Sequence, residues 1–178
     1  MALISAFIIA KNEEHRIARA IKSLQRVADE IIVIDSGSSD NTVKISEELG
    51  ARVVYNKWPG YVQQKIFGEK LCKHQWVLNI DADEELTDLL QDEIIAIFKS
   101  NIEDRYKAYR INFLIMHRKD VAPRLMAPSN TFIRLYNTRY ASFGNESKST
   151  THDAVLLNPG YEEKDNVYIF NYPDLHYS

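Results

Sequence analysis

Short apolar runs alternate with helical patterns along the first hundred residues. The runs are rich in β-branched side chains and too short for helices, which predicts buried strands. They cover Ile4–Ala10, Ile31–Asp35, Arg52–Tyr55 and Trp76–Ile80. Between and after them, apolar residues recur at helical spacing. The predicted helices cover residues 14–27, 40–49, 61–73 and 86–99. This alternation is typical of βαβ units, so we predict an α/β fold built on a parallel, Rossmann-like sheet.

A different pattern follows residue 104. Longer extended stretches replace the alternation, and a proline-containing loop and a polar segment separate them. They cover Ala108–Met116, Thr131–Tyr136 and Val167–Tyr172. We expect the sheet to become mixed in this half. The chain contains no internal repeat and no linker composition, so residues 1–178 are predicted to form a single domain with one shared core.

The composition is that of an ordinary soluble globular protein, with 45% hydrophobic residues, 26% charged residues and a net charge of −3. The single cysteine, Cys72, excludes an intramolecular disulfide framework and suits a reducing compartment. The apolar run at 4–10 is far shorter than a membrane span, and no basic segment precedes it as in a signal peptide. These features predict a cytoplasmic protein.

The charges are divided along the chain near residue 104. Residues 79–104 carry nine acids and one lysine, whereas residues 105–139 carry eight basic residues and one acid. A solvated helix accounts for much of the acidity. The basic stretch suits phosphate groups on a ligand or on anionic lipid, and a solvated strand face together with partners for the acidic helix explains it equally simply. Its aromatic residues follow strand spacing, which favours sheet packing over nucleic-acid binding.

Polar clusters follow the first two predicted strands, where ligands bind in open α/β sheets. The first cluster, at 11–14, suits either a ligand or a helix cap with acids in its first turn. Asp35 ends the second strand before any helix begins, so its carboxylate is a candidate acceptor for a base N–H or a ribose hydroxyl. Asp40 fits a helix cap better. No Gly-x-Gly-x-x-Gly or Walker loop follows the first strand, which disfavours a dinucleotide site.

A third polar cluster, Asp81-Ala82-Asp83-Glu84-Glu85, follows the fourth predicted strand. Two carboxylates separated by one residue can converge on one hard cation. Mg²⁺ or Mn²⁺ prefers such oxygens and bridges to phosphates, which suits a nucleoside diphosphate. A helix N-terminus rich in acids explains the same residues as well, and we assign Glu84 and Glu85 to that helix.

Together, the three strand ends resemble the family 2 glycosyltransferases of the GT-A fold. The matching segments are Asn12-Glu13-Glu14, Val33 to Asp40 and Leu78 to Glu84, in that order. The resemblance covers roughly residues 3 to 100, and within the family it is greatest to bacterial lipopolysaccharide core β-glucosyltransferases. Further matching pieces are Gly60 with Gln63, Gln64 and Lys65, then Phe132 to Tyr136, and Thr151 to Asp153. It implies a nucleotide-binding half at 1–104 and an acceptor-side half at 105–178.

The resemblance implies a metal-dependent hexosyltransferase. It would move a sugar with inversion from a UDP-sugar, UDP-glucose by this likeness, to a saccharide of the lipopolysaccharide core or another cell-envelope glycan. The residues it places near the nucleotide are Asn12, Glu14 and Lys65. Asp35 would accept the N3–H of uracil. Asp81 would lie by the ribose and the metal, and Asp83 would bind the Mg²⁺ or Mn²⁺ ion that bridges the two phosphates.

Inverting transfer needs a base that takes the proton of the acceptor hydroxyl. The resemblance makes Asp153 the candidate. Similar enzymes carry His-Glu where this chain has His152-Asp153, so the acid is retained but is one methylene shorter. His152 is a candidate metal ligand or orienting partner, and a satisfied loop histidine explains it equally well. For Asp153 the alternative is a turn or cap acid.

The basic stretch carries a hypothesis about the acceptor. Its cations would contact a phosphorylated, lipid-linked saccharide or the anionic inner face of the cytoplasmic membrane, which would make the protein peripheral there. They are Arg118, Lys119, Arg124, Arg134 and Arg139. The sequence leaves the oligomeric state open.

Similar enzymes continue past a segment like His176-Tyr177-Ser178 into a helical tail, which we expect this chain to lack. The alternative function is therefore a truncated nucleotide-sugar-binding domain with little or no transferase activity. A nucleotidyltransferase is disfavoured, because acids stand after the first strand where a triphosphate would need a basic loop.

Overall fold

The computed structural model describes residues 2–116, 129–144 and 154–177. In this part of the chain nine strands form one sheet in the order β3-β2-β1-β4-β7-β6-β11-β5, with β10 paired to β6, while β8 and β9 pair separately. The strands are β1 (Ile4–Ala10), β2 (Glu30–Asp35), β3 (Arg52–Tyr55), β4 (Trp76–Asp81), β5 (Glu84–Leu86), β6 (Ala108–Met116), β7 (Ser129–Asn137), β8 (Ala141–Phe143), β9 (Val155–Leu157), β10 (Val167–Ile169) and β11 (Asp174–Tyr177). The helices are α1 (Ile17–Leu24), α2 (Thr42–Glu48), α3 (Tyr61–Leu71), α4 (Asp88–Lys99) and α5 (Glu163–Asn166), with a 3₁₀ turn at Glu103–Arg105.

The sheet has a parallel half and a mixed half. Strands β3, β2, β1 and β4 are parallel, so their carboxyl ends lie along one edge. Beyond β4, β7 is antiparallel to both β4 and β6, β11 is parallel to β6, and β5 is antiparallel to β11. The predicted α/β class and the change from parallel to mixed pairing are both confirmed.

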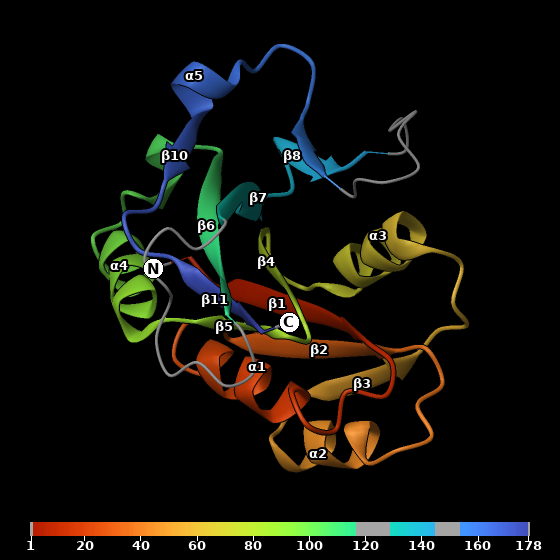
Figure 1. The fold of residues 1–178 in the computed structure, drawn as a ribbon. Coiled ribbons are helices and arrows are strands. Elements are labelled where there is room, and N and C mark those ends of the chain that lie inside the picture. The colour runs from red at the N-terminus through yellow and green to blue at the C-terminus, as the bar shows by residue number, and fades with distance from the viewer. Residues whose placement is uncertain (1, 117–128, 145–153, 178) are drawn as a thin grey trace.

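Helices cover both faces of the parallel half, which explains why every residue of β1 is buried. Ile8 belongs to a core with Ile21 of α1 and Ile94 of α4, whereas Phe7 and Ile9 belong to a second core with Ile66 of α3. Figure 1 shows α1 and α2 below the sheet and α3 on its opposite side. None of the helices in the described part is both long and apolar enough to span a bilayer.

Gly68 sets how closely α3 approaches β1. A Cβ atom built at this position would lie 2.6 Å from Cδ2 of Phe7 and 3.0 Å from Cδ1 of Ile34. Both neighbours are fully buried, so they have little room to move. The absence of a side chain at this position therefore lets the helix pack directly on the first strand.

Two predictions about element boundaries were wrong. The helix expected at 86–99 begins at Asp88, because Glu84–Leu86 form β5 and pair with β11. Thr87, whose hydroxyl accepts the backbone N–H of Leu90, caps this helix, so Glu84 and Glu85 do not serve its N-terminus. The stretch expected as one strand at 167–172 ends at Ile169, and a separate strand, β11, follows.

Candidate functional site

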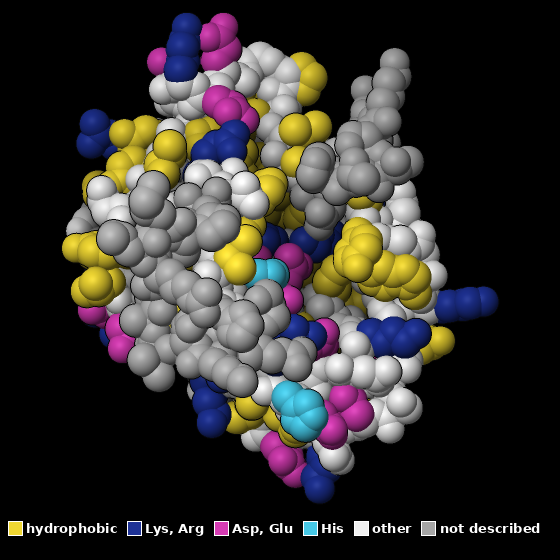
Figure 2. Space-filling view, viewed as in Figure 1, with side chains coloured by type: hydrophobic (Ala, Val, Ile, Leu, Met, Phe, Trp, Pro, Cys, Tyr) yellow, Lys and Arg dark blue, Asp and Glu magenta, His cyan; other side chains and the backbone are white. Residues whose placement is uncertain are grey.

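The carboxyl ends of β1, β2 and β4 bring the predicted residues to one edge of the sheet. Asp35, the last residue of β2, lies opposite Ala10 of β1, and Asp81, the last residue of β4, lies opposite Ile9. Figure 2 shows acidic, basic and histidine side chains gathered in a hollow near the middle of the visible face. The clusters that follow these strands therefore lie side by side.

The loops after β1 and β2 are tied together by their own polar side chains. The backbone N–H of Asn12 donates to the Ser38 hydroxyl at 2.9 Å, and the Asn12 side-chain oxygen accepts the N–H of Ser39 at 2.8 Å. Glu14 accepts the backbone N–H and the side-chain amide of Asn41 at 3.0 and 2.9 Å. Asn12 and Glu14 thus lie at the predicted edge, where they already hold the neighbouring loop.

Asp35 is buried and its carboxylate organises the turn that follows it. Its oxygens accept the N–H of Gly37 at 2.8 Å, and the N–H of Ser38 at 3.0 Å. The Ser38 hydroxyl donates to the same carboxylate. Gly37 has φ +93°, a conformation that favours glycine. Any contact of Asp35 with a base would be made by a carboxylate that already accepts these three groups.

Asp81 and Lys65 form the centre of a buried ion-pair network. Lys65 Nζ lies 2.9 Å from Asp81 Oδ1, and Arg134 Nη2 lies 3.2 Å from Asp81 Oδ2 and 2.5 Å from Glu84 Oε1. Lys65 is almost fully buried, in the middle of α3, although the sequence placed it only near a nucleotide. Both oxygens of Asp81 are therefore occupied by cations.

Burial and charge set the protonation of this network. Burial alone would raise the pKa of Asp81, but the charges of Lys65 and Arg134 outweigh it and hold the pKa well below its usual range. Burial raises the pKa of Glu84 to about 7, against the opposing charge of Arg134. Burial also raises the pKa of Asp174 well above its ordinary value, and neither of its side-chain oxygens has a hydrogen-bond partner in the described part of the chain.

Asp83 faces a histidine from the last strand. Its Oδ1 lies 3.6 Å from Nδ1 of His176, and its carbonyl accepts the N–H of Tyr177 at 2.8 Å. The Nδ1 atom of His176 is buried, and no hydrogen-bond partner for it lies among the described residues. A carboxylate oxygen beside an unbonded imidazole nitrogen is a donor set that suits a divalent cation.

The metal ligands that the described residues offer are nevertheless few. They contain no group of three or more His, Cys, Asp or Glu side chains arranged to hold an ion. Asp83 and His176 could thus provide two ligands, and the remaining positions would fall to phosphate oxygens and water, as is common for Mg²⁺. Asp81, predicted to share the ion, is engaged by Lys65 and Arg134 instead.

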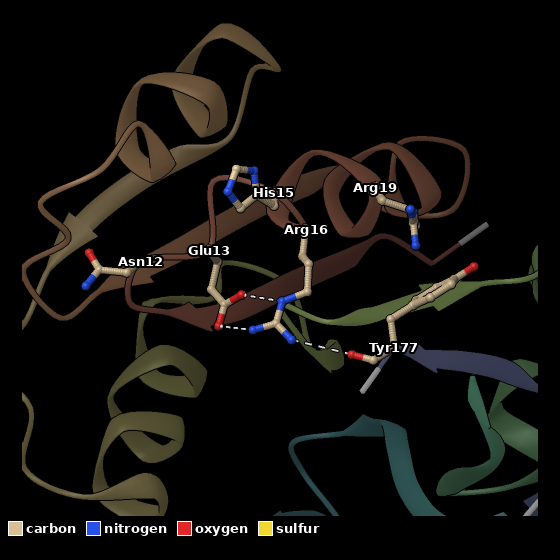
Figure 3. Close-up of a pocket in the computed structure, with 6 residues that line it drawn as sticks. All are labelled: Asn12, Glu13, His15, Arg16, Arg19 and Tyr177. Atoms are coloured by element: carbon tan, nitrogen blue, oxygen red, sulfur yellow. Dashed lines mark hydrogen bonds and ion pairs between the residues drawn. The ribbon is translucent and has the colours of Figure 1, made fainter. Parts of the chain in front are cut away.

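Arg16 of the loop before α1 connects Asp83 with the end of the chain. Its guanidinium donates to both carboxylate oxygens of Glu13, at 2.7 and 3.1 Å, and to the carbonyl oxygen of Tyr177 at 3.4 Å (Figure 3). Its Nη1 lies 3.7 Å from Asp83 Oδ2. The guanidinium of Arg19 stacks 4.0 Å from the centre of the Tyr177 ring. These contacts border a cavity of about 460 Å³ and fasten β11 to the first helix.

A small cavity of about 140 Å³ lies behind the ion-pair network. Lys65, Asp81, Glu84, Arg134 and His176 provide its polar lining. Phe113 and Phe132, whose rings stack with centroids 5.4 Å apart, contribute an aromatic wall. Apolar ring faces beside hydrogen-bonding groups suit a sugar, which presents C–H groups on its faces and hydroxyls at its rim.

The sequence missed several residues of this site. Arg134 was considered as a surface contact for lipid or an acceptor, but it is buried against Asp81 and Glu84, so that interpretation was wrong for this residue. Asp174 and His176 belong to β11, which lies beyond the predicted stretch at 167–172, and the only signal for it in the sequence was the His-Tyr-Ser segment at 176–178.

Several predicted site residues lie outside the described residues. They are His152, Asp153, Arg118, Lys119 and Arg124. Their predicted roles as catalytic base, metal ligand and acceptor contacts therefore stay predictions. Arg139, the last of the basic stretch, is exposed and lies just after β7.

Comparison with known proteins identifies the family. The family model described as "Glycosyl transferase family 2" matches residues 5–145, which includes the three strand ends and the Asp81–Asp83 pair. The chain belongs to glycosyltransferase family 2. This membership confirms the resemblance on which the assignment of the three strand ends rests.

Relatives of this glycosyltransferase chain include proteins that carry the name "Uncharacterized glycosyltransferase". A glycosyltransferase of Rickettsia conorii is 56% identical over 175 residues, covering 98% of this chain and 62% of the relative. The lipopolysaccharide core biosynthesis glycosyltransferase LpsC of Rhizobium meliloti is 42% identical over 94 residues, covering 50% of this chain and 34% of LpsC. The chain thus spans about three-fifths of the length of its Rickettsia relative.

A solved structure supports the fold. The crystal structure of TarS residues 1–349 from Staphylococcus aureus matches with a TM-score of 0.50 at 20% identity, covering 69% of this chain and 38% of TarS. At this identity the likeness concerns the fold alone. Together with the family match, it agrees with the predicted GT-A arrangement of a parallel sheet that continues into mixed strands.

Proposed function

We propose that the chain is the donor-binding part of an inverting, metal-dependent hexosyltransferase that takes its sugar from a UDP-sugar, with UDP-glucose as the expected donor. The observation that carries this proposal is the meeting of Asp83 with His176 at the same edge as the Asp81–Lys65 ion pair, beside the cavity of about 140 Å³. That edge offers two candidate metal ligands, a buried cation and a pocket that suits a single sugar ring.

The residues at this edge of the sheet have different proposed roles. Asp83 and His176 would hold a Mg²⁺ or Mn²⁺ ion, which when bound would offset the negative charge on the diphosphate leaving group. Lys65 and Arg134 keep Asp81 ionised and fixed, so that it can accept a hydroxyl of the ribose or of the sugar. Asn12 and Glu14 hold the loop after β2 in position for the nucleoside.

The proposal for the acceptor side of the reaction rests on the sequence alone, because His152 and Asp153 lie outside the described residues. We propose Asp153 as the base that takes the acceptor proton, with His152 beside it as an orienting group or further metal ligand. Asp153→Asn should then leave the affinity for UDP unchanged and remove transfer. A variant that transfers at the full rate would exclude Asp153 as the base.

Titration of UDP in the presence of Mn²⁺, and again in EDTA, tests the proposal directly. We expect binding that weakens at least tenfold without the metal. Assays of UDP-glucose hydrolysis and of transfer to lipopolysaccharide core saccharides follow. Absence of UDP binding under both conditions would overturn the proposal. Other UDP-sugars tested in parallel would show whether glucose is the preferred sugar.

A nucleotide-sugar-binding domain that is incomplete as a catalyst is the second candidate. The specific observation in its favour is that the contacts at the sheet edge, between Lys65 and Asp81 and between Asp83 and His176, all belong to the proposed donor side. In that case UDP binds with Mn²⁺, but neither hydrolysis nor transfer follows. The same titration and assays therefore separate the two candidates.

We also propose a cytoplasmic location, with a cell-envelope saccharide or its lipid-linked form as the acceptor. Peripheral contact with anionic lipid through exposed cations such as Arg139 would bring the protein to a lipid-linked acceptor. Co-sedimentation with vesicles containing phosphatidylglycerol, compared with phosphatidylcholine vesicles, tests the contact. Equal recovery with both kinds of vesicle would exclude it.

A further inference from the structure

Two aromatic rings face solvent at the edge of the site, one from Trp58 in the loop between β3 and α3 and one from Tyr61, the first residue of α3. Trp58 is 41% exposed and Tyr61 is 67% exposed. Their rings meet edge to face, with centroids 4.8 Å apart and planes at 90°. Single exposed aromatic residues are common, but here two of them meet and border the same cavity. Figure 2 shows apolar side chains at the surface over α3, next to the hollow that holds the charged residues.

The cavity under these rings has a volume of about 360 Å³. Its other walls are Ile9 and Ala10 at the end of β1, with Lys11 and Glu13 just beyond it. The lining is thus apolar on the sides formed by the rings and the strand, and it carries a cation and an anion at its rim. This combination suits a flat, partly polar ring better than a compact ion.

The cavity lies between the two ends of the proposed donor site. Ile9 is paired with Asp81, and Ala10 is paired with Asp35. Tyr61 precedes Lys65 by one turn of α3, and residues four apart share one helix face. Lys65 in turn contacts Asp81. A nucleoside diphosphate whose phosphates reach Asp83 could therefore lay its base, which lies beyond the ribose, against Trp58 and Tyr61.

We propose that Trp58 and Tyr61 form the surface on which the base of the nucleotide donor packs. The inference rests on the proposed function and adds two residues that determine nucleotide affinity. A pyrimidine base is planar and stacks on aromatic side chains, and it would meet the turn held by Asp35 at its edge. Because the Asp35 carboxylate already accepts three groups of its own turn, stacking on the aromatic pair would supply much of the affinity for the base.

Tryptophan fluorescence tests this proposal, because the chain has two tryptophans in different environments. Trp58 is exposed, whereas Trp76 in β4 is only 2% exposed and packs against Phe98 and Tyr109. Titration with UDP and with uridine, which needs no metal, should quench the fluorescence of the wild-type protein. The Trp58→Phe variant should lose the fluorescence change while calorimetry shows that it still binds UDP.

Affinity provides the second readout. From the strength of base–aromatic stacking, Trp58→Ala should weaken UDP binding by roughly ten- to a hundredfold, with a smaller loss for Tyr61→Ala and near-complete recovery in Trp58→Phe. Tyr172→Ala, at an exposed tyrosine that does not line the cavity, is the matched control and should bind UDP like the wild type. Unfolding by urea, followed by circular dichroism, shows whether each variant is folded.

The outcomes separate this proposal from the proposed function. If the wild type binds no UDP, the proposed function itself fails. If the wild type binds UDP but Trp58→Ala binds it equally well, the stacking proposal is overturned and the donor site stands. If methyl β-glucoside quenches Trp58 and uridine does not, the aromatic pair holds a sugar ring, and the assignment to the base is overturned.

Discussion

Asp83 and His176 face each other with 3.6 Å between Oδ1 and Nδ1, although one follows β4 and the other belongs to β11 at the end of the described chain. The strand order brings them together, because β11 pairs with β5, which follows Asp83 directly. Asp83 was predicted from a local motif, but its partner His176 lies outside that motif.

Removal of either side chain should weaken the binding of Mn²⁺. Asp83→Ala and His176→Ala are each expected to weaken Mn²⁺ binding by tenfold or more, because each variant leaves a single protein ligand. Calorimetry and the Mn²⁺ electron paramagnetic resonance signal measure the affinity. Asp92→Ala, at an exposed acid on α4, is the control. Unchanged Mn²⁺ affinity in both site variants would exclude the pair as the metal ligands.

Arg16 should act as a positioning residue for β11. In Arg16→Gln the contacts with Tyr177 and Asp83 are lost, so amide hydrogens of β11 should exchange faster even without metal or nucleotide. Mn²⁺ affinity should fall as His176 becomes less fixed, and Arg16→Lys should recover part of it. Arg26→Gln, at an exposed arginine paired with Asp92, is the control. Exchange rates in β11 equal to the wild type would contradict this role.

Glu84 should make stability depend on pH between about 4.5 and 7. Its pKa is about 7 in the folded protein against an ordinary value of 4.5, so the folded state holds this proton more tightly than the unfolded state does. The contribution of Glu84 is therefore fully present below pH 4.5 and is lost as the pH rises to 7, by up to about 3 kcal/mol.

Glu84→Gln should remove this loss. The free energy of unfolding of the variant, relative to the wild type, should rise between pH 4.5 and 7, as measured by urea unfolding at several pH values. Burial raises the pKa of Asp174 as well, so part of the dependence should persist in the variant. A constant difference between the two proteins across this range would show that Glu84 does not titrate there.

Gly68→Ala should destabilise the fold without changing any residue of the candidate site. The added methyl would collide with the buried ring of Phe7, so α3 must shift or the ring must leave its rotamer, at a cost of about 1–3 kcal/mol. Urea unfolding monitored by circular dichroism measures the loss. Gln63→Ala, at an exposed position of the same helix, should change stability by less than about 0.5 kcal/mol. Equal stability of the two variants would argue against close packing of α3 on β1.

The sequence predicted the parallel half of the fold well, and with it three of the strand ends. Apolar runs and helical spacing are local signals, and they identified β1 to β4 and the helices between them. The same signals failed at Glu84–Leu86, because two glutamates and a leucine look like the start of an acidic helix until β11 is available as a partner. The sequence placed Asp81 and Asp83 correctly at one edge of the sheet. It did not predict that Asp81 contacts Lys65 and Arg134, whereas Asp83 faces His176.

By itself the sequence therefore determined the α/β class, the order of the first elements and the family, since each depends on residues close together along the chain. Only the tertiary structure decided that Arg134 is a buried counter-ion of Asp81 and Glu84, that His176 meets Asp83, and that Trp58 and Tyr61 border the same edge. The physical reason is that these contacts join strands and loops far apart in the sequence. Charge compensation and strand pairing determine such partners in the folded protein. The local periodicity of the sequence contains no information about them.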